Sequence, residues 1–308
     1  MATEGRSQTE QTLQTPQFGL AQGRKPKAAL TVVDPSLAGT PTSTPSSGGQ
    51  VTEATPDNTI SGSVETHNRH TGDTEQVAVT VAPSGYPYQT VGVVESGIGN
   101  DAGNVQKRGT GVLVGRNLLL TSSELAPWGQ SSWWMRFAPG FTNGTAPFGW
   151  IYVERYFGYD EAVMTPANDY VVCKLFSPVG DSCGWMGAET FLVDTGFTQN
   201  LWSTIGLMVD KSYSYPIPVI VQDVKIDTFQ DGPNDKLLVS GTFSPPIASD
   251  EVKYSGWLGA PLFGPGLNPV VVGLFCSGIP TGSKYQSAWA AGDEMLQLIQ
   301  YGLANWAA

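Results

Sequence analysis

Histidine is almost absent from this chain of 308 residues, and the two that occur, His67 and His70, both lie within the first 80 residues. The rest of the chain has no imidazole, so a base with a pKa near neutrality would there have to be a carboxylate raised by burial. The His67 and His70 pair has no third ligand nearby in the sequence. We interpret it as two solvated side chains and expect no metal site.

Cysteine and long apolar runs are also scarce. The three cysteines, Cys173, Cys183 and Cys276, are widely spaced and form no Cys-x-x-Cys pair. We expect buried thiols in a reducing compartment, and the sequence leaves one disulfide open. No apolar run approaches the roughly 18 residues of a membrane span, and the first residues have no apolar core of a secretion signal. These absences predict a cytoplasmic protein without a membrane partner.

Charged side chains make up only 14% of the residues, and the net charge is -11. A negative field repels phosphate backbones, so we expect no nucleic-acid partner. Glycine and proline are plentiful instead, at 37 and 22 residues, which is typical of a turn-rich β protein. No cofactor is expected.

The composition changes near residue 80. The first 80 residues contain one aromatic residue, Phe18, and stretches such as "AGTPTSTPSSGGQVTEATPDNTISGS", whereas all nine tryptophans lie beyond them. Such a segment buries too little apolar surface to offset the entropy of ordering its backbone. We therefore predict an extended or disordered arm over residues 1–85, followed by a folded body over residues 86–308.

The body consists of short apolar segments separated by Gly, Pro, Asn and Asp. Examples are "GTGVLVG", "NLLLTS", "DYVVCKLF" and "PVVVGLFCSG". This punctuation predicts strands of a barrel or sandwich. The last segment, "AGDEMLQLIQYGLANW", places Leu296, Ile299 and Leu303 on one helical face, with Asp293 able to cap its start. We expect an all-β body closed by one C-terminal helix.

Four blocks of the body resemble the chymotrypsin-fold serine proteases, in particular the glutamyl endopeptidase branch. The blocks occur in the order of that family: "GTGVLVGRNLLLTSSEL", "FAPGFTNGTAPFGWIYVERYF", "NDYVVCKLFSPVGDSCGWMG" and "SGWLGAPLFGPGLNPVVVGLFCSG". The resemblance covers nearly the whole body. It implies a double six-stranded β-barrel, with the first barrel at about 86–190, the second at about 191–290 and a C-terminal α-helix at 291–306.

The departures from this family fall on its catalytic triad. In "LTSSEL" the position of the base histidine is Glu124, and in "GWLGAP" the position of the nucleophilic serine is Leu258. Only the third position is kept, as Asp169. Acyl transfer in this fold needs a hydroxyl activated by an imidazole, and leucine has neither a lone pair nor an acidic proton. The sequence therefore predicts a degenerate site, with the hydroxyls or backbone N–H groups of Ser122 and Ser123 available to Asp169 and with Glu124 turned toward solvent.

The nucleophile turn itself is kept as Gly256, Trp257, Leu258 and Gly259, whose backbone N–H groups would form a relic oxyanion hole. Trp257 has two interpretations: it is buried in the former active centre, which we favour, or it is exposed as an anchor for a partner. Trp133 and Trp134 are adjacent on a strand, so their side chains point to opposite faces. We expect one in the core and one in a surface patch. Trp257, Trp133 and Trp134 are thus the candidate partner-binding residues.

Three functions follow from this interpretation. The first is a pseudoprotease that acts as a structural or interaction subunit of a large assembly, such as a virus particle or its surface decoration, and whose residues 1–80 become ordered on a protein partner. The second is an active hydrolase that uses Glu124 and Asp169 as a carboxylate pair. The third is a regulatory pseudoprotease that binds peptides in the former cleft.

Overall fold

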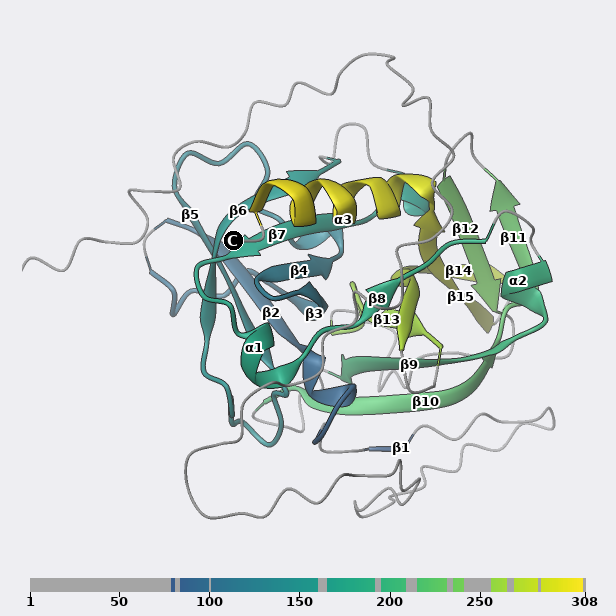
Figure 1. Ribbon diagram of the computed structural model, residues 1–308, viewed down its shortest axis with the longest axis horizontal. Helices are drawn as coiled ribbons and strands as arrows, with labels where there is room; N and C mark the ends of the chain where they lie inside the picture. The colour runs from purple at the N-terminus through teal and green to yellow at the C-terminus, as the bar shows by residue number, and fades with distance from the viewer. Residues whose placement is uncertain are drawn as a thin grey trace, which may run out of the picture.

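The computed structural model describes residues 79–80, 84–99, 101–159, 165–191, 195–208, 215–231, 235–240, 256–264, 269–281 and 284–306. These residues form two β structures and one long helix (Figure 1). The all-β fold with a C-terminal helix that the sequence predicts is therefore confirmed. Most of the predicted arm, including His67 and His70, lies outside the described residues.

The first half of the body is a closed barrel with the strand order β2-β3-β4-β7-β6-β5. Its strands are β2 (Val91–Ile98), β3 (Lys107–Gly115), β4 (Leu118–Thr121), β5 (Trp133–Pro139), β6 (Ile151–Gly158) and β7 (Val171–Leu175). All its neighbouring strands are antiparallel. The short 3-10 turn η3 (Tyr88–Thr90) precedes β2, and η4 (Ser123–Leu125) and η5 (Pro166–Asn168) lie between strands of the barrel.

The second half is a nine-stranded sheet with the order β1-β10-β9-β13-β14-β15-β12-β11, and β8 pairs with β14. Its strands are β1 (Val79–Thr80), β8 (Gly187–Ala188), β9 (Leu201–Met208), β10 (Ile217–Lys225), β11 (Thr228–Asp231), β12 (Asp235–Ser240), β13 (Pro261–Phe263), β14 (Val270–Thr281) and β15 (Lys284–Gly292). The sheet exceeds six strands because short segments such as β1 and β8 add to it. Two residues of the predicted arm are thus a strand on β10.

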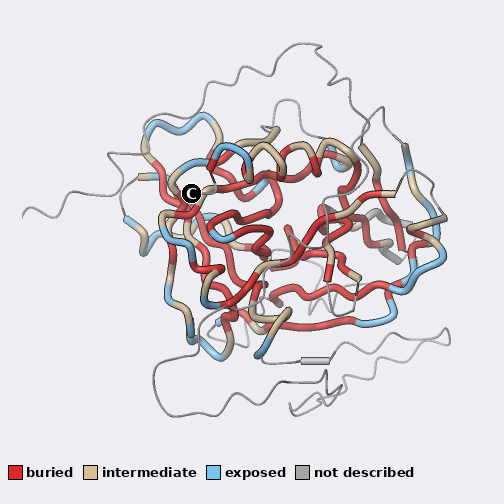
Figure 2. Tube along the Cα trace, viewed as in Figure 1, coloured by how far each residue is buried: buried red, intermediate tan, exposed pale blue. Residues whose placement is uncertain are grey.

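Strands β3 and β4 are buried on both faces, which explains their nearly continuous apolar sequences. Leu113 and Leu119 point into the first barrel, whereas Val112 and Leu120 belong to a second apolar cluster that contains residues of both halves. A third cluster fills the interior of the second half. Figure 2 shows that buried segments of the chain run through both halves.

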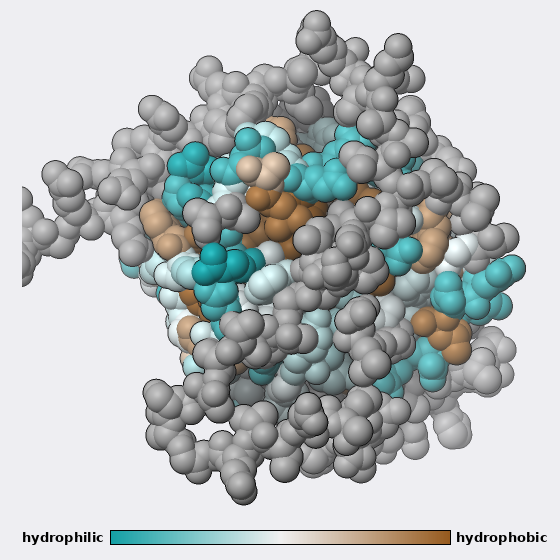
Figure 3. Space-filling model, viewed as in Figure 1, coloured by the Kyte–Doolittle hydropathy of each residue, from teal (hydrophilic) through white to brown (hydrophobic). Residues whose placement is uncertain are grey.

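The helix α3 (Asp293–Trp306) covers the cluster shared by the two halves. It runs from the second sheet to the first barrel, above β4 and β7 (Figure 1). Leu296 and Ile299 are buried and Leu303 is half-buried, as their helical spacing predicts. Figure 3 shows hydrophilic and apolar residues side by side in the upper part of this face. The other helices, α1 (Gly180–Cys183) and α2 (Thr195–Thr198), are single turns.

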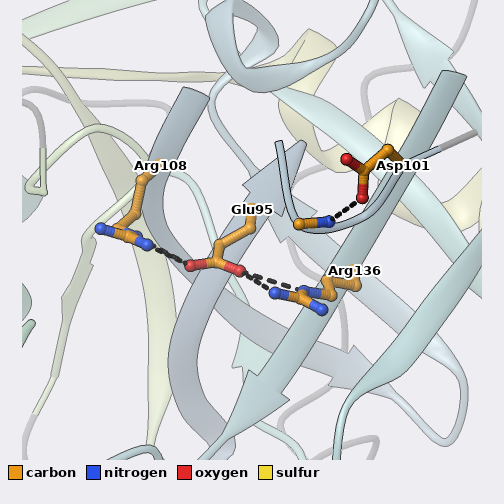
Figure 4. Close-up of polar contacts among 5 residues, drawn as sticks. Glu95, Asp101, Arg108 and Arg136 are labelled. Atoms are coloured by element: carbon orange, nitrogen blue, oxygen red, sulfur yellow. Dashed lines mark hydrogen bonds and ion pairs between the residues drawn. The ribbon is translucent and has the colours of Figure 1, made fainter. Parts of the chain in front are cut away.

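A buried carboxylate fixes the register of three barrel strands. Glu95 on β2 lies opposite Arg108 on β3 and opposite Arg136 on β5. Arg108 donates to Oε1 from Nε and Nη2 at 2.8 and 2.6 Å, and Arg136 donates to Oε2 from the same atoms at 3.0 and 2.6 Å (Figure 4). The Arg136 guanidinium also lies 4.2 Å from the ring centre of Trp150 and 5.4 Å from that of Trp134. Each oxygen of the Glu95 carboxylate thus accepts hydrogen bonds from one arginine, so the two guanidinium groups satisfy this buried charge.

Candidate functional site

Asp169 occupies the centre of the site that the sequence predicts. It follows η5 and precedes β7, and its exposed fraction is 1%. The Ser122 hydroxyl donates to both carboxylate oxygens at 2.9 Å. The Glu124 backbone N–H donates to Oδ1 at 3.1 Å. The hydrogen bonds predicted from Ser122 and from the backbone beside it are therefore present.

The environment of Asp169 favours its neutral form. Burial raises its pKa from 3.8 to about 7, and the negative charge of Glu124 adds to this effect. The Ser122 hydroxyl and the backbone N–H groups of Ser123 and Glu124 act in the opposite direction, because they stabilise the carboxylate. Asp169, the one triad position that the sequence resemblance keeps, is thus a carboxyl group that titrates close to neutral pH.

Glu124, which the sequence resemblance aligns with the base histidine, is the second residue of η4, and its side chain is exposed. Ser122 caps this turn by accepting a hydrogen bond from the Glu124 N–H at 3.2 Å. Lys107 donates to the Glu124 backbone carbonyl at 2.7 Å. The backbone of Glu124 is therefore fixed toward Asp169 while its carboxylate faces solvent.

The turn Gly256–Gly259, which the sequence resemblance aligns with the nucleophile turn, carries two apolar side chains. Trp257 is 2% exposed and belongs to the apolar cluster of the second half. Its ring lies 6.2 Å from that of Phe275, and it leaves no room for a Cβ at Gly206, which would lie 2.5 Å from the indole. Leu258 points the other way and packs against the interior of the first barrel. The burial favoured for Trp257 is therefore found, and its alternative role as an exposed anchor is wrong.

The end of this turn requires a glycine. Gly259 has φ +81°, and a Cβ there would lie 2.3 Å from the Thr110 carbonyl oxygen and 2.8 Å from the Ser122 nitrogen. The Gly259 N–H donates to the Phe275 carbonyl at 2.9 Å. This N–H is consequently engaged within the protein and not directed at a ligand.

Thr110 joins this turn to the first barrel, which the sequence did not reveal. Its hydroxyl donates to the Gly256 carbonyl at 2.6 Å and accepts from the Leu207 N–H at 3.1 Å. Its own N–H donates to the Leu258 carbonyl at 2.8 Å. Thr110 is fully buried, so these bonds are shielded from water. A threonine between two glycines of a strand gives no sequence signal for such a role.

The hydroxyl of Ser122 contacts the carboxyl group of Asp169 directly. A serine 2.9 Å from a carboxyl group that titrates near neutrality has the geometry of an activated nucleophile. However, Ser122 is 0% exposed, so no substrate carbonyl can reach its oxygen. Cys276 is buried as well, and burial together with the charge of Asp169 raises the pKa of its thiol. Neither side chain faces an open cleft.

The three cysteines are all buried and free. The disulfide that the sequence left open is therefore absent from this structure. Burial raises the pKa of the Cys183 thiol to about 12 and raises those of Cys173 and Cys276 further. These thiols are packing residues with little thiolate character.

The expected tryptophan surface patch is wrong. Trp133 and Trp134 do point to opposite faces of β5, but their exposed fractions are only 4% and 5%. Trp133 packs edge-on against Tyr156 inside the barrel. Trp134 lies on the outer face, where Arg136 and β2 cover it: a Cβ at Gly97 would lie 2.7 Å from its ring. An outward-facing side chain is thus buried by its neighbours.

Among the described residues, no three His, Cys, Asp or Glu side chains are grouped as a metal site would require. In the same part of the chain, no helix has the length and apolar content needed to span a membrane.

The sequence matches no family model and no curated protein. Solved structures do match. A Glu endopeptidase in complex with MPD aligns with a TM-score of 0.57 and 18% identity, over 76% of this chain and 99% of its own. The protease Anisep from Arthrobacter nicotinovorans aligns with a TM-score of 0.54 and 13% identity, over 75% of this chain and 100% of its own. At these identities the likeness concerns the fold, and it shows that this chain has the chymotrypsin-type fold of trypsin-like serine proteases.

Proposed function

We propose that this protein is a pseudoprotease, a chain with the trypsin-like fold that acts by binding and not by hydrolysis. The observation that carries the proposal is the occupation of the former active centre. Leu258 replaces the nucleophile, and Ser122 holds Asp169 in the place where a histidine would act. Without a nucleophile and an imidazole, the fold has lost the two groups that its chemistry needs.

The packing around the turn also supports this proposal. A catalytic serine has to stand at the surface of a cleft, whereas Trp257 and Leu258 each join an apolar cluster. Burying large apolar side chains contributes roughly 2–3 kcal/mol each, which favours a closed and dry centre. The former cleft thus contributes to stability.

The test is a search for turnover. The full chain would be treated with a serine-reactive fluorophosphonate and incubated with a mixed peptide library, beside an active trypsin-like protease. We expect no labelling and no cleavage. Reproducible cleavage by this chain would refute the proposal if it disappears in Glu124→Gln or in Asp169→Asn.

One observation favours a second candidate, a hydrolase that uses Glu124 and Asp169. The two carboxyl groups interact, and the pKa of Asp169 is raised to about 7, which suits a general base. The same assay separates the candidates, because Glu124→Gln removes one member of the pair at an exposed position. We favour the binding function because Asp169 itself is buried.

For the binding function, we propose a structural or interaction subunit of a large assembly, such as a virus particle or its surface decoration, with residues 1–80 ordered on a protein partner. The composition of that segment supports this, since such chains often fold on binding. Purifying the protein from its native source and sizing it tests the idea. Co-migration with a megadalton particle supports it, and a lone species of 32.7 kDa contradicts it.

A peptide-binding regulator is the remaining candidate for the same fold. Trp257 is buried and offers no contact to a peptide, so this candidate would need other residues of the cleft. Binding of library peptides to the full chain without turnover would favour it over an assembly subunit.

A further inference from the structure

One edge of the nine-stranded sheet has only a short cover. On one side, β10 pairs with β9 at seven positions. On the other side, the pairing that the structure shows is that of Ile220 with Val79 and of Val219 with Thr80, the two residues of β1. Within the described residues no strand lies beyond β1, so β1 is the outer border of the sheet (Figure 1). The end of the arm therefore covers part of a sheet edge.

The middle of β10 is well suited to pair with another strand. Residues 217–221 are uncharged, and the last three are all β-branched. Both faces of this stretch are already packed. Ile220 belongs to the apolar cluster shared by the halves, and Val219 and Val221 belong to the cluster of the second half. The backbone edge is thus the side that remains for a further contact, and uncharged edges of this kind associate between chains unless something covers them.

The ends of this stretch limit the length of a partner strand. Beyond Val221 the pairing with β9 shifts at a β-bulge, where Asp223 has φ +57°. A bulge bends the strand and ends regular pairing along its edge. Near the other end, Pro218 has no N–H to donate, which weakens pairing there. A partner strand would therefore be short and would lie mainly along residues 219–221.

We propose that β1 is a removable cap on this edge, and that a second copy of the chain pairs through its own β10 once the cap is withdrawn. In the capped form an extended backbone lies on the edge, so an extended backbone is the kind of ligand that fits it. A second copy supplies one, because loss of β1 exposes the same edge on both chains. Two identical edges that pair antiparallel are related by a twofold axis and form a closed dimer.

This inference rests in one respect on the proposed function, in which a partner orders residues 1–80. Val79 and Thr80 form β1 at the end of that segment. Binding of the arm to its partner draws β1 away from β10, so one event both engages the partner and joins two copies. The cap makes two residue pairs with β10, whereas β9 makes seven, so the cap is the contact that opens first.

Variants of the full chain separate the uncapped form from the capped form. The uncapped variant carries Val79→Pro and Thr80→Pro, because proline has no N–H for the ladder. Thr80→Pro alone serves if the double variant does not fold, which urea unfolding followed by tryptophan fluorescence would show. Thr66→Pro is the matched control, since it places a proline elsewhere in the arm.

The capped variant carries Val79→Cys and Ile220→Cys, which lie opposite each other, so that a disulfide within the chain holds β1 in place. Thr80→Cys with Val219→Cys is the neighbouring pair and serves if the first disulfide does not form. Neighbouring pairs of an antiparallel ladder alternate in their spacing, so one of the two suits a disulfide better.

Sedimentation velocity over a range of protein concentrations measures the outcome. We expect the wild type, the capped variant and Thr66→Pro to sediment as monomers of 32.7 kDa. The uncapped variant should shift to about twice that mass as its concentration rises. Hydrogen exchange at residues 217–221 should slow together with this shift, because the edge becomes paired.

Three results overturn the proposal: an uncapped variant that stays a monomer, a dimer without slower exchange at residues 217–221, or a capped variant that dimerises equally. None of these measurements involves a partner or a peptide substrate. Their failure removes the cap and leaves the pseudoprotease proposal standing, whereas cleavage of library peptides refutes the pseudoprotease and leaves the cap standing.

Discussion

Replacing Asp169 with asparagine should make folding less dependent on pH. Asp169 is buried, and burial raises its pKa to about 7 in the folded protein. In the unfolded chain a pKa of about 3.9 is expected. Between these two values the folded state binds more protons than the unfolded state, so the free energy of unfolding decreases as the pH rises. Below this window the contribution is fully present, and above it the contribution is lost.

The size of the effect follows from the difference between the two pKa values. A shift from about 3.9 to about 7 corresponds to about 4 kcal/mol of stability lost between acid and alkaline solution. An asparagine at this position would keep an oxygen as acceptor for Ser122 but would never ionise. We therefore expect Asp169→Asn to be slightly less stable than the wild type at about pH 5 and more stable at about pH 8.

Urea unfolding followed by tryptophan fluorescence, repeated from about pH 5 to about pH 8, measures this difference. Asp181→Asn is the control, because Asp181 pairs with Arg116 at the surface and its pKa is lowered by that partner. Some slope should remain in Asp169→Asn, since Asp235 also titrates near neutrality. If Asp169→Asn and the wild type lose the same free energy over this range, the buried carboxyl does not control it and the reasoning is wrong.

Three further predictions concern packing, the ion cluster and the thiols. Trp257→Ala should lower the free energy of unfolding by about 3–5 kcal/mol, because it opens a cavity in the second half. Leu201→Ala, at a position that is 55% exposed, should change the free energy of unfolding by about 0.5 kcal/mol at most. Equal effects of the two variants in urea unfolding would contradict the burial of Trp257. Glu95→Gln should cost about 2 kcal/mol, less than for a fully buried pair because Arg108 is 33% exposed, and the loss should appear in thermal unfolding. The three thiols should react with a disulfide reagent only after unfolding, and fast reaction of any one in the native protein would contradict their burial.

The sequence predicted the fold well where strands are apolar on both faces. Runs such as those of β3 and β4 can be recognised because both faces contact apolar clusters. Strand β15 was missed, since "KYQSAWAAG" is rich in small residues and poor in β-branched ones. It is nevertheless paired on both sides, with β14 and with β12. Its small residues suit a crowded central position, so tertiary packing overrides local propensity there.

Residues of the candidate site could be assigned from the sequence only where they lie in blocks that resemble the protease family. These blocks contain Glu124, Asp169 and Leu258, and the structure brings the Glu124 N–H into contact with Asp169. The bonds that Thr110 makes to Gly256 and Leu207 have no such signal, since 146 and 97 positions separate these residues and only the fold brings them together. The exposure of Trp134 was mispredicted for a related reason: alternation along a strand says which face a side chain takes, but not what covers that face.

The position of Thr110 has a consequence for how the molecule comes apart. Through its side chain and its backbone N–H, the buried Thr110 on β3 in the first half bonds to the turn at Gly256 and Leu258 and to β9, which belong to the second half. In many enzymes, ligand sites lie at such an interface between domains. Here bonds that are shielded from water hold the interface between the halves closed. Heat or denaturant should therefore unfold both halves in one cooperative step.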